Sequence, residues 1–214
     1  MRKLLTLLLT LGLVISFTQM APSNPIPVPM YDWEDGGTVL ALYGSGDPPI
    51  IATNVGAPDP VFAGLSSLRL EDNSPSGTPQ AYIAFLWNLQ DGDFISAGFW
   101  RYDMTPDAAP SCRIWAHWND ELPGNPDGYN GSAGGNSDYG LGEGWDYTWW
   151  DWEVVDGHTG LVIEARTYSE LGDTVWIDDL DILAPDHVYI QFPGNGPIAT
   201  ETKTWGNIKT LYSD

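Results

Sequence analysis

The feature that most constrains the fold is a series of short strand-like runs separated by turn-forming residues. Six runs combine aromatic and β-branched residues, and clusters of Gly, Pro, Asn and Asp lie between them. This pattern is typical of strands joined by turns. The runs cover residues 80–89, 93–104, 111–118, 147–155, 160–168 and 175–183. Because no amphipathic helical pattern occurs before residue 200, the sequence predicts an all-β fold, an antiparallel β-sandwich or jelly roll.

One connection in this series is unusually long. Residues 119–146 are rich in Gly, Asn and Asp and contain few apolar residues. Loops of this length are either functional or disordered. We therefore expect a loop here, and two alternatives stay open: it borders a binding site, or it is a disordered insertion.

The N-terminal segment has the pattern of an export signal. Basic residues at its start precede an apolar run that ends near Val14 and is too short to span a bilayer comfortably. We interpret residues 1–21 as a signal peptide and expect a secreted, extracellular protein. The single cysteine, Cys112, excludes an intrachain disulfide and lies far from any lipid-attachment position, so no lipid anchor is expected.

The remaining chain is expected to form one domain, residues 31–183, followed by a tail of residues 184–214. Apolar residues recur in the tail at helical spacing, which predicts a short amphipathic helix there. These residues are Trp205, Ile208, Leu211 and Tyr212.

The net charge narrows the class of partner. Asp and Glu number 29 against 8 Lys and Arg, which gives a formal charge of −21. Such a surface repels phosphate backbones and anionic lipids, so we expect neither nucleic acid nor membrane binding. Neutral or cationic partners remain, and we expect a monomer. The 11 Trp and 10 Tyr residues argue against a disordered chain.

The last strand-like run contains three carboxylates: Asp178, Asp179 and Asp181. Adjacent buried carboxylates repel each other unless a cation joins them, and this chain has few cations of its own. A bound cation is therefore one interpretation, and solvated charges on an edge strand are the other. Alternation places Ile177 on the face of Asp179 but Leu180 on the face of Asp178, and a β-bulge would reconcile the two.

Four motifs in order resemble one family of binding domains. They are YDWEDGG (31–37), FAGLSSLRLED (62–72), DGDFISAGFWRYDM (91–104) and VWIDDLDI (175–182). Together they resemble the calcium-stabilised jelly-roll carbohydrate-binding modules attached to bacterial glycosidases, the cellulose- and xylan-binding, galactose-binding-like type. The resemblance covers residues 31–183. The sequence departs from the family pattern at Trp33, where Phe is usual, and in the length of the 119–146 loop.

The resemblance implies a structural calcium ion and a polysaccharide ligand. In such a fold the first and last strands meet, so Glu34 would approach Asp178 and Asp179 and share a cation with them. Calcium takes roughly six to eight oxygen ligands, which carboxylates, backbone carbonyls and water can supply. The ion would join the chain ends and take no part in chemistry.

Candidate ligand-binding residues follow from the alternation of side chains along the strands. Aromatic rings can stack on the apolar faces of sugar rings, while Arg and His can bond hydroxyl groups. Cys112, Ile114 and Ala116 form an apolar face, and the opposite face of that strand mixes rings with polar groups. For each tryptophan, packing in the core is the alternative. The candidates are Trp100, Tyr102, Arg113, Trp115, His117 and Trp149.

Three functions compete at this stage. The expected one is non-catalytic binding of a neutral polysaccharide, and a structural or adhesive extracellular protein is the alternative. An enzyme is the least favoured, because Asp151 and Glu153 would lie side by side on one strand, whereas a glycosidase places two carboxylates across its substrate.

The signal-peptide prediction can be checked by mass spectrometry of exported protein. We expect the mature chain to begin between Phe17 and Pro22, because the apolar run ends shortly before these residues. Exported material that still carries Met1 would contradict the prediction.

Overall fold

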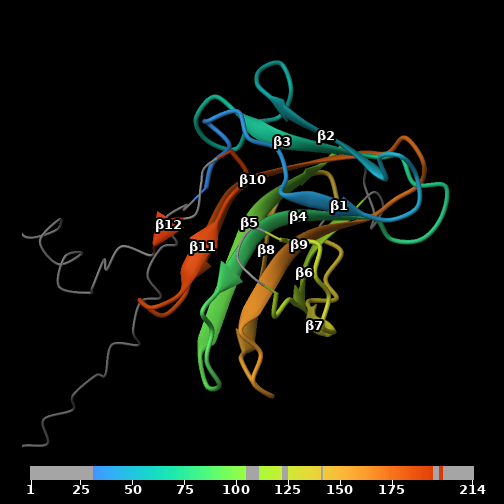
Figure 1. Ribbon diagram of the computed structural model, residues 1–214. Helices are drawn as coiled ribbons and strands as arrows, with labels where there is room; N and C mark the ends of the chain where they lie inside the picture. The colour runs from blue at the N-terminus through green and yellow to red at the C-terminus, as the bar shows by residue number, and fades with distance from the viewer. Residues whose placement is uncertain (1–30, 105–110, 122–124, 141, 195–197, 200–214) are drawn as a thin grey trace, which may run out of the picture.

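The chain folds into two antiparallel β-sheets that pack face to face (Figure 1). The computed structural model describes residues 31–104, 111–121, 125–140, 142–194 and 198–199. This part of the chain forms twelve strands and no helix, which confirms the predicted all-β sandwich. Over the same residues, no segment forms a helix long and apolar enough to cross a membrane.

One sheet has five strands in the order β2-β3-β10-β5-β8. The strands are β2 (Ile50–Val55), β3 (Ser67–Asp72), β10 (Thr174–Leu183), β5 (Phe94–Asp103) and β8 (Gly144–Glu153). Strand β10 therefore lies in the middle of the sheet, and β8 forms one edge. The central position of β10 rules out the interpretation that its carboxylates are edge-strand charges.

The other sheet has seven strands in the order β12-β11-β4-β9-β6-β7, with β1 also pairing with β4. Successive strands from β3 to β6, and again from β8 to β11, alternate between the two sheets, as in a jelly roll. The strands of this sheet are β1 (Ala41–Tyr43), β4 (Gln80–Trp87), β6 (Ser111–Trp118), β7 (Ser132–Gly135), β9 (Gly160–Tyr168), β11 (Tyr189–Gln191) and β12 (Ile198–Ala199).

The six predicted strands correspond to β4, β5, β6, β8, β9 and β10. The prediction of a single loop over 119–146 is wrong in part, because it contains β7 and the start of β8. Strand β7 has the sequence SAGG, whose small residues give no strand signal, and it forms by pairing with β6. Strands β11 and β12 extend the sheet beyond residue 183. The predicted signal peptide and tail helix lie outside the described residues.

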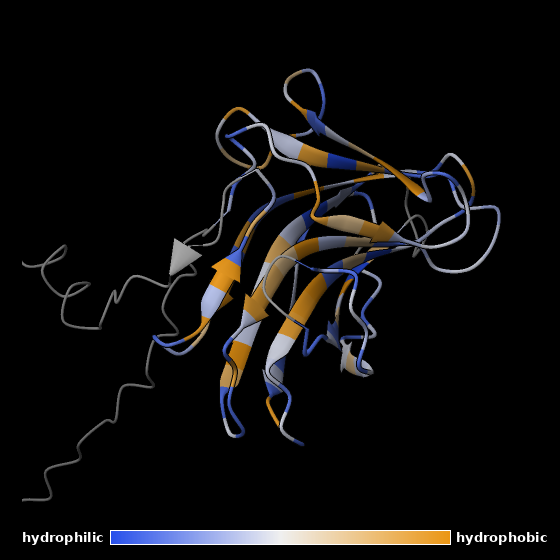
Figure 2. Ribbon diagram, viewed as in Figure 1, coloured by the Kyte–Doolittle hydropathy of each residue, from blue (hydrophilic) through white to orange (hydrophobic). Residues whose placement is uncertain are grey.

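The core lies between the sheets and follows the period of two in each strand. Apolar and polar residues alternate along several strands in Figure 2. In β5, Ile95, Ala97 and Phe99 are buried in the core, and in β6, Ile114 and Ala116 face them from the other sheet. Burial of each large apolar side chain stabilises the fold by roughly 1.5–3 kcal/mol.

Gly98 of β5 leaves room for a side chain that crosses the outer face of the five-stranded sheet. Gly98 lies between Trp149 of β8 and Asp181 of β10 in the strand register. The Tyr147 hydroxyl donates a hydrogen bond to Asp181 Oδ1 at 2.5 Å. A Cβ atom on residue 98 would collide with this hydroxyl, so the tyrosine can cross only above a glycine.

We expect Gly98→Ala to lower the free energy of unfolding by about 1–3 kcal/mol, because it displaces Tyr147 and leaves Asp181 without its donor. Urea unfolding measures the change. In a Tyr147→Ala background the same substitution should cost less, since the nearest colliding group is gone and only the milder contact with Thr148 O, at 2.9 Å, remains. Equal costs in both backgrounds would contradict this explanation.

Candidate functional site

Aromatic side chains cover the outer face of the five-stranded sheet. Because Ile95, Ala97 and Phe99 of β5 face the core, the alternate residues Trp100 and Tyr102 face outward. We call the whole group the aromatic face. Its members are Phe62, Trp100, Tyr102, Trp145, Tyr147, Trp149 and Trp176.

Most rings of the aromatic face touch one another. Phe62, from the loop between β2 and β3, stacks on Trp100 with centroids 4.0 Å apart and planes 15° apart. Trp145 meets Phe62 and Tyr102 edge to face, at 5.4 and 5.3 Å. Trp100 also lies 5.4 Å from Tyr147. These are favourable geometries for aromatic pairs, so the rings form a continuous surface.

A pocket of about 370 Å³ borders the aromatic face on the side where the edges of the two sheets meet. Trp152 Nε1 donates to Gly134 O at 3.1 Å and so joins β8 to β7 there. Trp149 is 54% exposed and Trp150 39%, so both rings are available to a ligand. The pocket is lined by Asn136, Asp138, Tyr147, Thr148, Trp149, Trp150 and Asp151.

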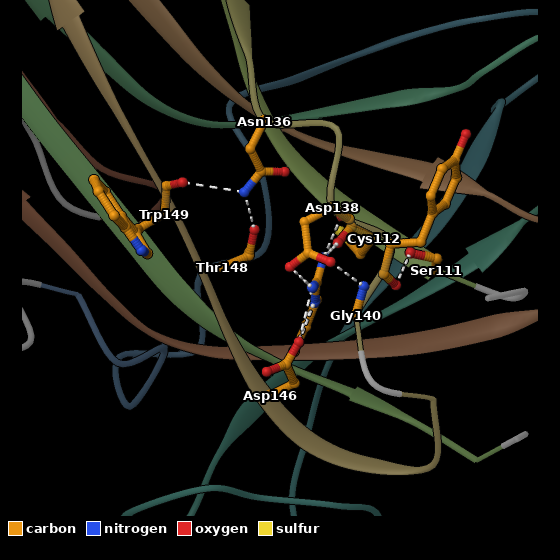
Figure 3. A network of polar contacts seen from close by, with 10 residues as sticks. Ser111, Cys112, Asn136, Asp138, Gly140, Asp146, Thr148 and Trp149 are labelled. Carbon is orange, nitrogen blue, oxygen red and sulfur yellow. Dashed lines mark hydrogen bonds and ion pairs between the residues drawn. The ribbon is translucent and has the colours of Figure 1, made fainter. Parts of the chain in front are cut away.

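Asn136 connects the two walls of the pocket. Its Nδ2 donates to Thr148 Oγ1 at 2.7 Å and to Trp149 O at 3.0 Å, as Figure 3 shows. These two bonds determine the orientation of the amide. Its Oδ1 is buried and has no hydrogen-bond partner among the described residues, and the residue is only 9% exposed. Asn136 thus retains one unsatisfied acceptor at the pocket.

A buried arginine, Arg101, fixes the side of the pocket that contains Asp138. Arg101 is 4% exposed, and its guanidinium donates to Asp146 Oδ2 at 2.8 Å, to Asp138 Oδ2 at 2.9 Å and to Cys112 O at 2.6 Å. Asp138 also accepts a bond from the Gly140 amide, drawn in Figure 3. That amide and the Arg101 charge lower the pKa of Asp138, so its carboxylate remains ionised.

Two carboxylates, the buried Asp178 and the exposed Glu34, hold the loop that carries Phe62. Asp178 Oδ2 accepts a hydrogen bond from the Phe62 amide at 2.9 Å. Glu34 Oε1 accepts from the amides of Leu65 and Ser66, at 2.5 and 2.8 Å. Both residues were predicted from sequence as metal ligands, and in the structure both bind the same loop.

The predicted β-bulge in β10 is confirmed. The register of β10 against β5 shifts between Asp178 and Asp181, and Asp179 has a φ of 48°. Asp178 and Leu180 are both fully buried as a result. Tyr31 pairs with Leu180 through bonds of 2.9 and 3.0 Å, so the start of the domain meets the last of the six predicted strands as expected.

The calcium ion stays a prediction. Over the described residues, no group of three Asp, Glu, His or Cys side chains is arranged to hold a metal ion. The oxygens of Asp178 and one oxygen of Glu34 accept amide hydrogen bonds. Asp179 does lie near other acids: burial, then the charges of Asp32 and Glu34, raise its pKa.

The outer face of the seven-stranded sheet carries a different set of side chains. His117 is 1% exposed, with Nδ1 2.5 Å from Glu164 Oε1 and Nε2 3.0 Å from Gly128 O. Arg166 Nε donates to Glu164 Oε2 at 2.5 Å, and its guanidinium lies 4.6 Å from the Trp115 ring centroid. The side chains of His117, Glu164 and Arg166 are therefore already bound to one another or to the backbone.

Arg113 is also enclosed by protein. It is 8% exposed, and its guanidinium carbon lies 3.8 Å from the ring centroid of Tyr139 and 3.7 Å from that of Tyr168. The guanidinium is thus held between two rings. Its position joins β6 and β9 to the segment that carries Asp138.

The structure divides the six predicted ligand residues between two sheets. Trp100, Tyr102 and Trp149 lie on the five-stranded sheet, whereas Arg113, Trp115 and His117 lie on the seven-stranded sheet. The two groups do not form one site. Their alternation within each strand agrees with the prediction, but sheet membership depends on long-range pairing that the residues of a strand do not reveal.

Several residues of the site were missed. Trp145 and Tyr147 share the face of Trp149 along β8, so the period of two could have identified them. The period of two places Trp150 on the core side of β8, but it is exposed because β8 is an edge strand. Phe62 and Asn136 lie in loops, where no periodicity indicates direction.

Comparison with known proteins identifies no family. No protein-family model matches the sequence, and no curated protein is similar to it. Solved structures of similar shape include carbohydrate-binding modules of families 16, 22 and 30.

Three of the similar structures differ in kind. The enzymatically active domain of bacteriophage CBA120 tailspike protein 4 has 14% identity and a TM-score of 0.48 over 68% of this chain, and this chain spans only 19% of that one. The K1 cleaved adhesin domain of Porphyromonas gingivalis Lys-gingipain has 14% identity and a TM-score of 0.47, with 72% and 96% covered. The C-terminal family 22 module of Clostridium thermocellum Xyn10B has 12% identity and a TM-score of 0.45, and the match covers 74% of this chain and 95% of that one.

The buried carboxylate in β10 predicts an unusual pH dependence. Burial raises the pKa of Asp178 from 3.8 to about 7, although the amides of Ala63, Asp179 and Phe62 oppose the shift. Because the pKa of Asp178 is higher in the folded than in the unfolded chain, the protonated carboxyl favours the folded state. Its contribution to the free energy of unfolding is fully present below about pH 4 and is lost as the pH rises toward 7. In chelator, we expect a loss on the order of 3 kcal/mol over that range.

Thermal melts with added calcium extend this test. An ion near Asp178 and Asp179 would favour their ionised forms, so calcium should raise the melting temperature at neutral pH and flatten the pH dependence. An unchanged melting temperature would contradict the calcium prediction. In chelator, Asp178→Asn should reduce the pH dependence, and the remainder should come largely from Asp179 and Asp181, whose pKa values burial also raises. A profile equal to that of the wild type would contradict the role of Asp178.

Proposed function

We propose that this is a secreted, non-catalytic protein that binds a neutral polysaccharide at the aromatic face and its adjoining pocket. The observation that carries the proposal is the pair of exposed rings, Trp149 and Trp150, beside a pocket of about 370 Å³. Pockets that bind small ligands start at about 300 Å³ and combine apolar walls with a few polar groups.

The polar groups of the pocket suit sugar hydroxyls. The carboxylates of Asp138 and Asp151 are exposed hydrogen-bond acceptors, and a hydroxyl can donate to each. The rings can stack on the apolar C–H faces of the same sugar. A uronic acid would approach against the negative field of the chain, so a neutral polymer fits better.

The enzyme alternative receives less support. A glycosidase needs one carboxylic acid whose pKa is raised, so that it can protonate the leaving oxygen. Asp138 lines the same pocket as Asp151, but its amide and arginine partners lower its pKa. We therefore propose no hydrolytic activity. Release of new reducing ends from any polysaccharide would contradict this part of the proposal.

We also propose a structural calcium ion near Glu34, Asp178 and Asp179, secretion, and a monomeric state. The acidic neighbours of Asp179 support the cation, and the export pattern supports secretion. Analytical ultracentrifugation tests the monomer. A structural or adhesive role without sugar binding is the second candidate, because the seven-stranded sheet presents side chains that are already paired.

The proposal predicts that Trp149→Ala weakens binding of a glucan or xylan oligosaccharide roughly tenfold or more, because a central ring contributes about 1–3 kcal/mol. The melting temperature should hardly change, since Trp149 is exposed. Calorimetry measures both properties. Tyr43→Ala is the matched control, because Tyr43 is a 62% exposed ring on the other sheet.

Trp115→Ala distinguishes the two sheets in the same experiment. If Trp115→Ala abolishes binding and Trp149→Ala does not, the site lies on the seven-stranded sheet and the proposed location is wrong. A folded wild type that binds no polysaccharide would favour the structural role.

A further inference from the structure

The side chains that line the pocket offer carboxylate and amide acceptors, and the donors without a partner among the described residues include the indole N–H groups of Trp149 and Trp150. Asn136 Oδ1 lacks a partner, and its own Nδ2 is used within the protein. The Tyr147 hydroxyl donates to Asp181. Asp138 and Asp151 contribute carboxylates. A ligand that fits this pocket must therefore supply donors to the carboxylates, while its acceptors can meet the indole N–H groups.

No free cation competes for these carboxylates. Among the described residues the cationic side chains are four arginines. Arg69 pairs with a glutamate on its own strand, and Arg166 pairs with another. Arg113 is enclosed between two tyrosines. Arg101 lies behind Asp138 and points its charge at the backbone and at two aspartates.

Asp151 is the pocket's uncompensated charge. It is exposed, and it has no hydrogen-bond or ion-pair partner among the described residues. Along β8 it follows Trp149 and Trp150, whose exposed rings can each attract a cation over the ring face. An ammonium group placed here would meet a carboxylate and an aromatic ring together.

We infer that this pocket prefers an amino sugar with a protonated amine over a neutral sugar of the same size. The inference rests on the proposed function, because it uses the same sugar site, and it changes the preferred ligand from a neutral to a cationic sugar. Such a residue keeps the apolar face that stacks on Trp149, supplies hydroxyl donors to the exposed carboxylate of Asp138, and adds an ammonium donor for Asp151. Acetylation of the amine removes its charge, and the preference disappears with it.

The test compares three β-1,4-linked oligosaccharides of equal length, built from glucosamine, N-acetylglucosamine or glucose. Calorimetry is done at mildly acidic pH, where the amine is protonated, and at low ionic strength. We expect the glucosamine oligomer to bind about twofold to fivefold more tightly than the other two, as for an exposed ion pair. High salt should remove the difference.

Two variants separate a specific contact from general attraction to an acidic protein. Asp151→Asn should reduce the glucosamine oligomer to the affinity of the glucose oligomer. Glu170→Gln makes the same change of charge at an exposed carboxylate outside the pocket and should leave the preference intact.

The outcomes distinguish the two proposals. Equal affinity for all three oligomers would overturn the inference and leave the proposed function standing. A preference that survives Asp151→Asn, or falls equally in Glu170→Gln, would also overturn it. Absence of binding to all three oligomers would overturn both the inference and the proposed function.

Discussion

The buried carboxylate of Asp178 joins the middle of β10 to the loop before β3, and the place of Phe62 in the aromatic face depends on it. Asp178 lies in a central strand, and a bulge turns both it and Leu180 into the interior. Leu180 pairs with Tyr31 at the start of the fold, while Asp178 holds the loop that places Phe62 on Trp100. Burial of an acid in this position raises its pKa, so the arrangement gains its order at a cost in stability at neutral pH.

A second buried charge organises the pocket in a similar way. Arg101 joins β5 to Asp146 of β8, to β6 and to the segment after β7. Its guanidinium is almost fully buried, and removal of either partner of such a pair is strongly destabilising. The walls of the pocket are therefore positioned before a ligand arrives, which lowers the entropy cost of binding.

The sequence predicted the parts of this structure that follow from local periodicity. A period of two predicted six of the strands and the outward direction of Trp100 and Trp149. The bulge near Asp179 followed because strict alternation would place the apolar residues Ile177 and Leu180 on opposite faces of β10. The location of the site could not be predicted in the same way. Phe62 and Asn136 reach it from loops, and only the contact between β7 and β8, which belong to different sheets, brings Asn136 to Trp149.

The claim that sugar binds at the edge of the five-stranded sheet is tested most directly by NMR of the tryptophan indole N–H signals. The 11 tryptophans are titrated with a soluble neutral oligosaccharide after assignment by single substitutions. We expect the signals of Trp149 and Trp150 to shift with one shared dissociation constant, while those of Trp87 and Trp115 on the other sheet stay in place. Shifts confined to Trp115 and Trp87 would contradict the account.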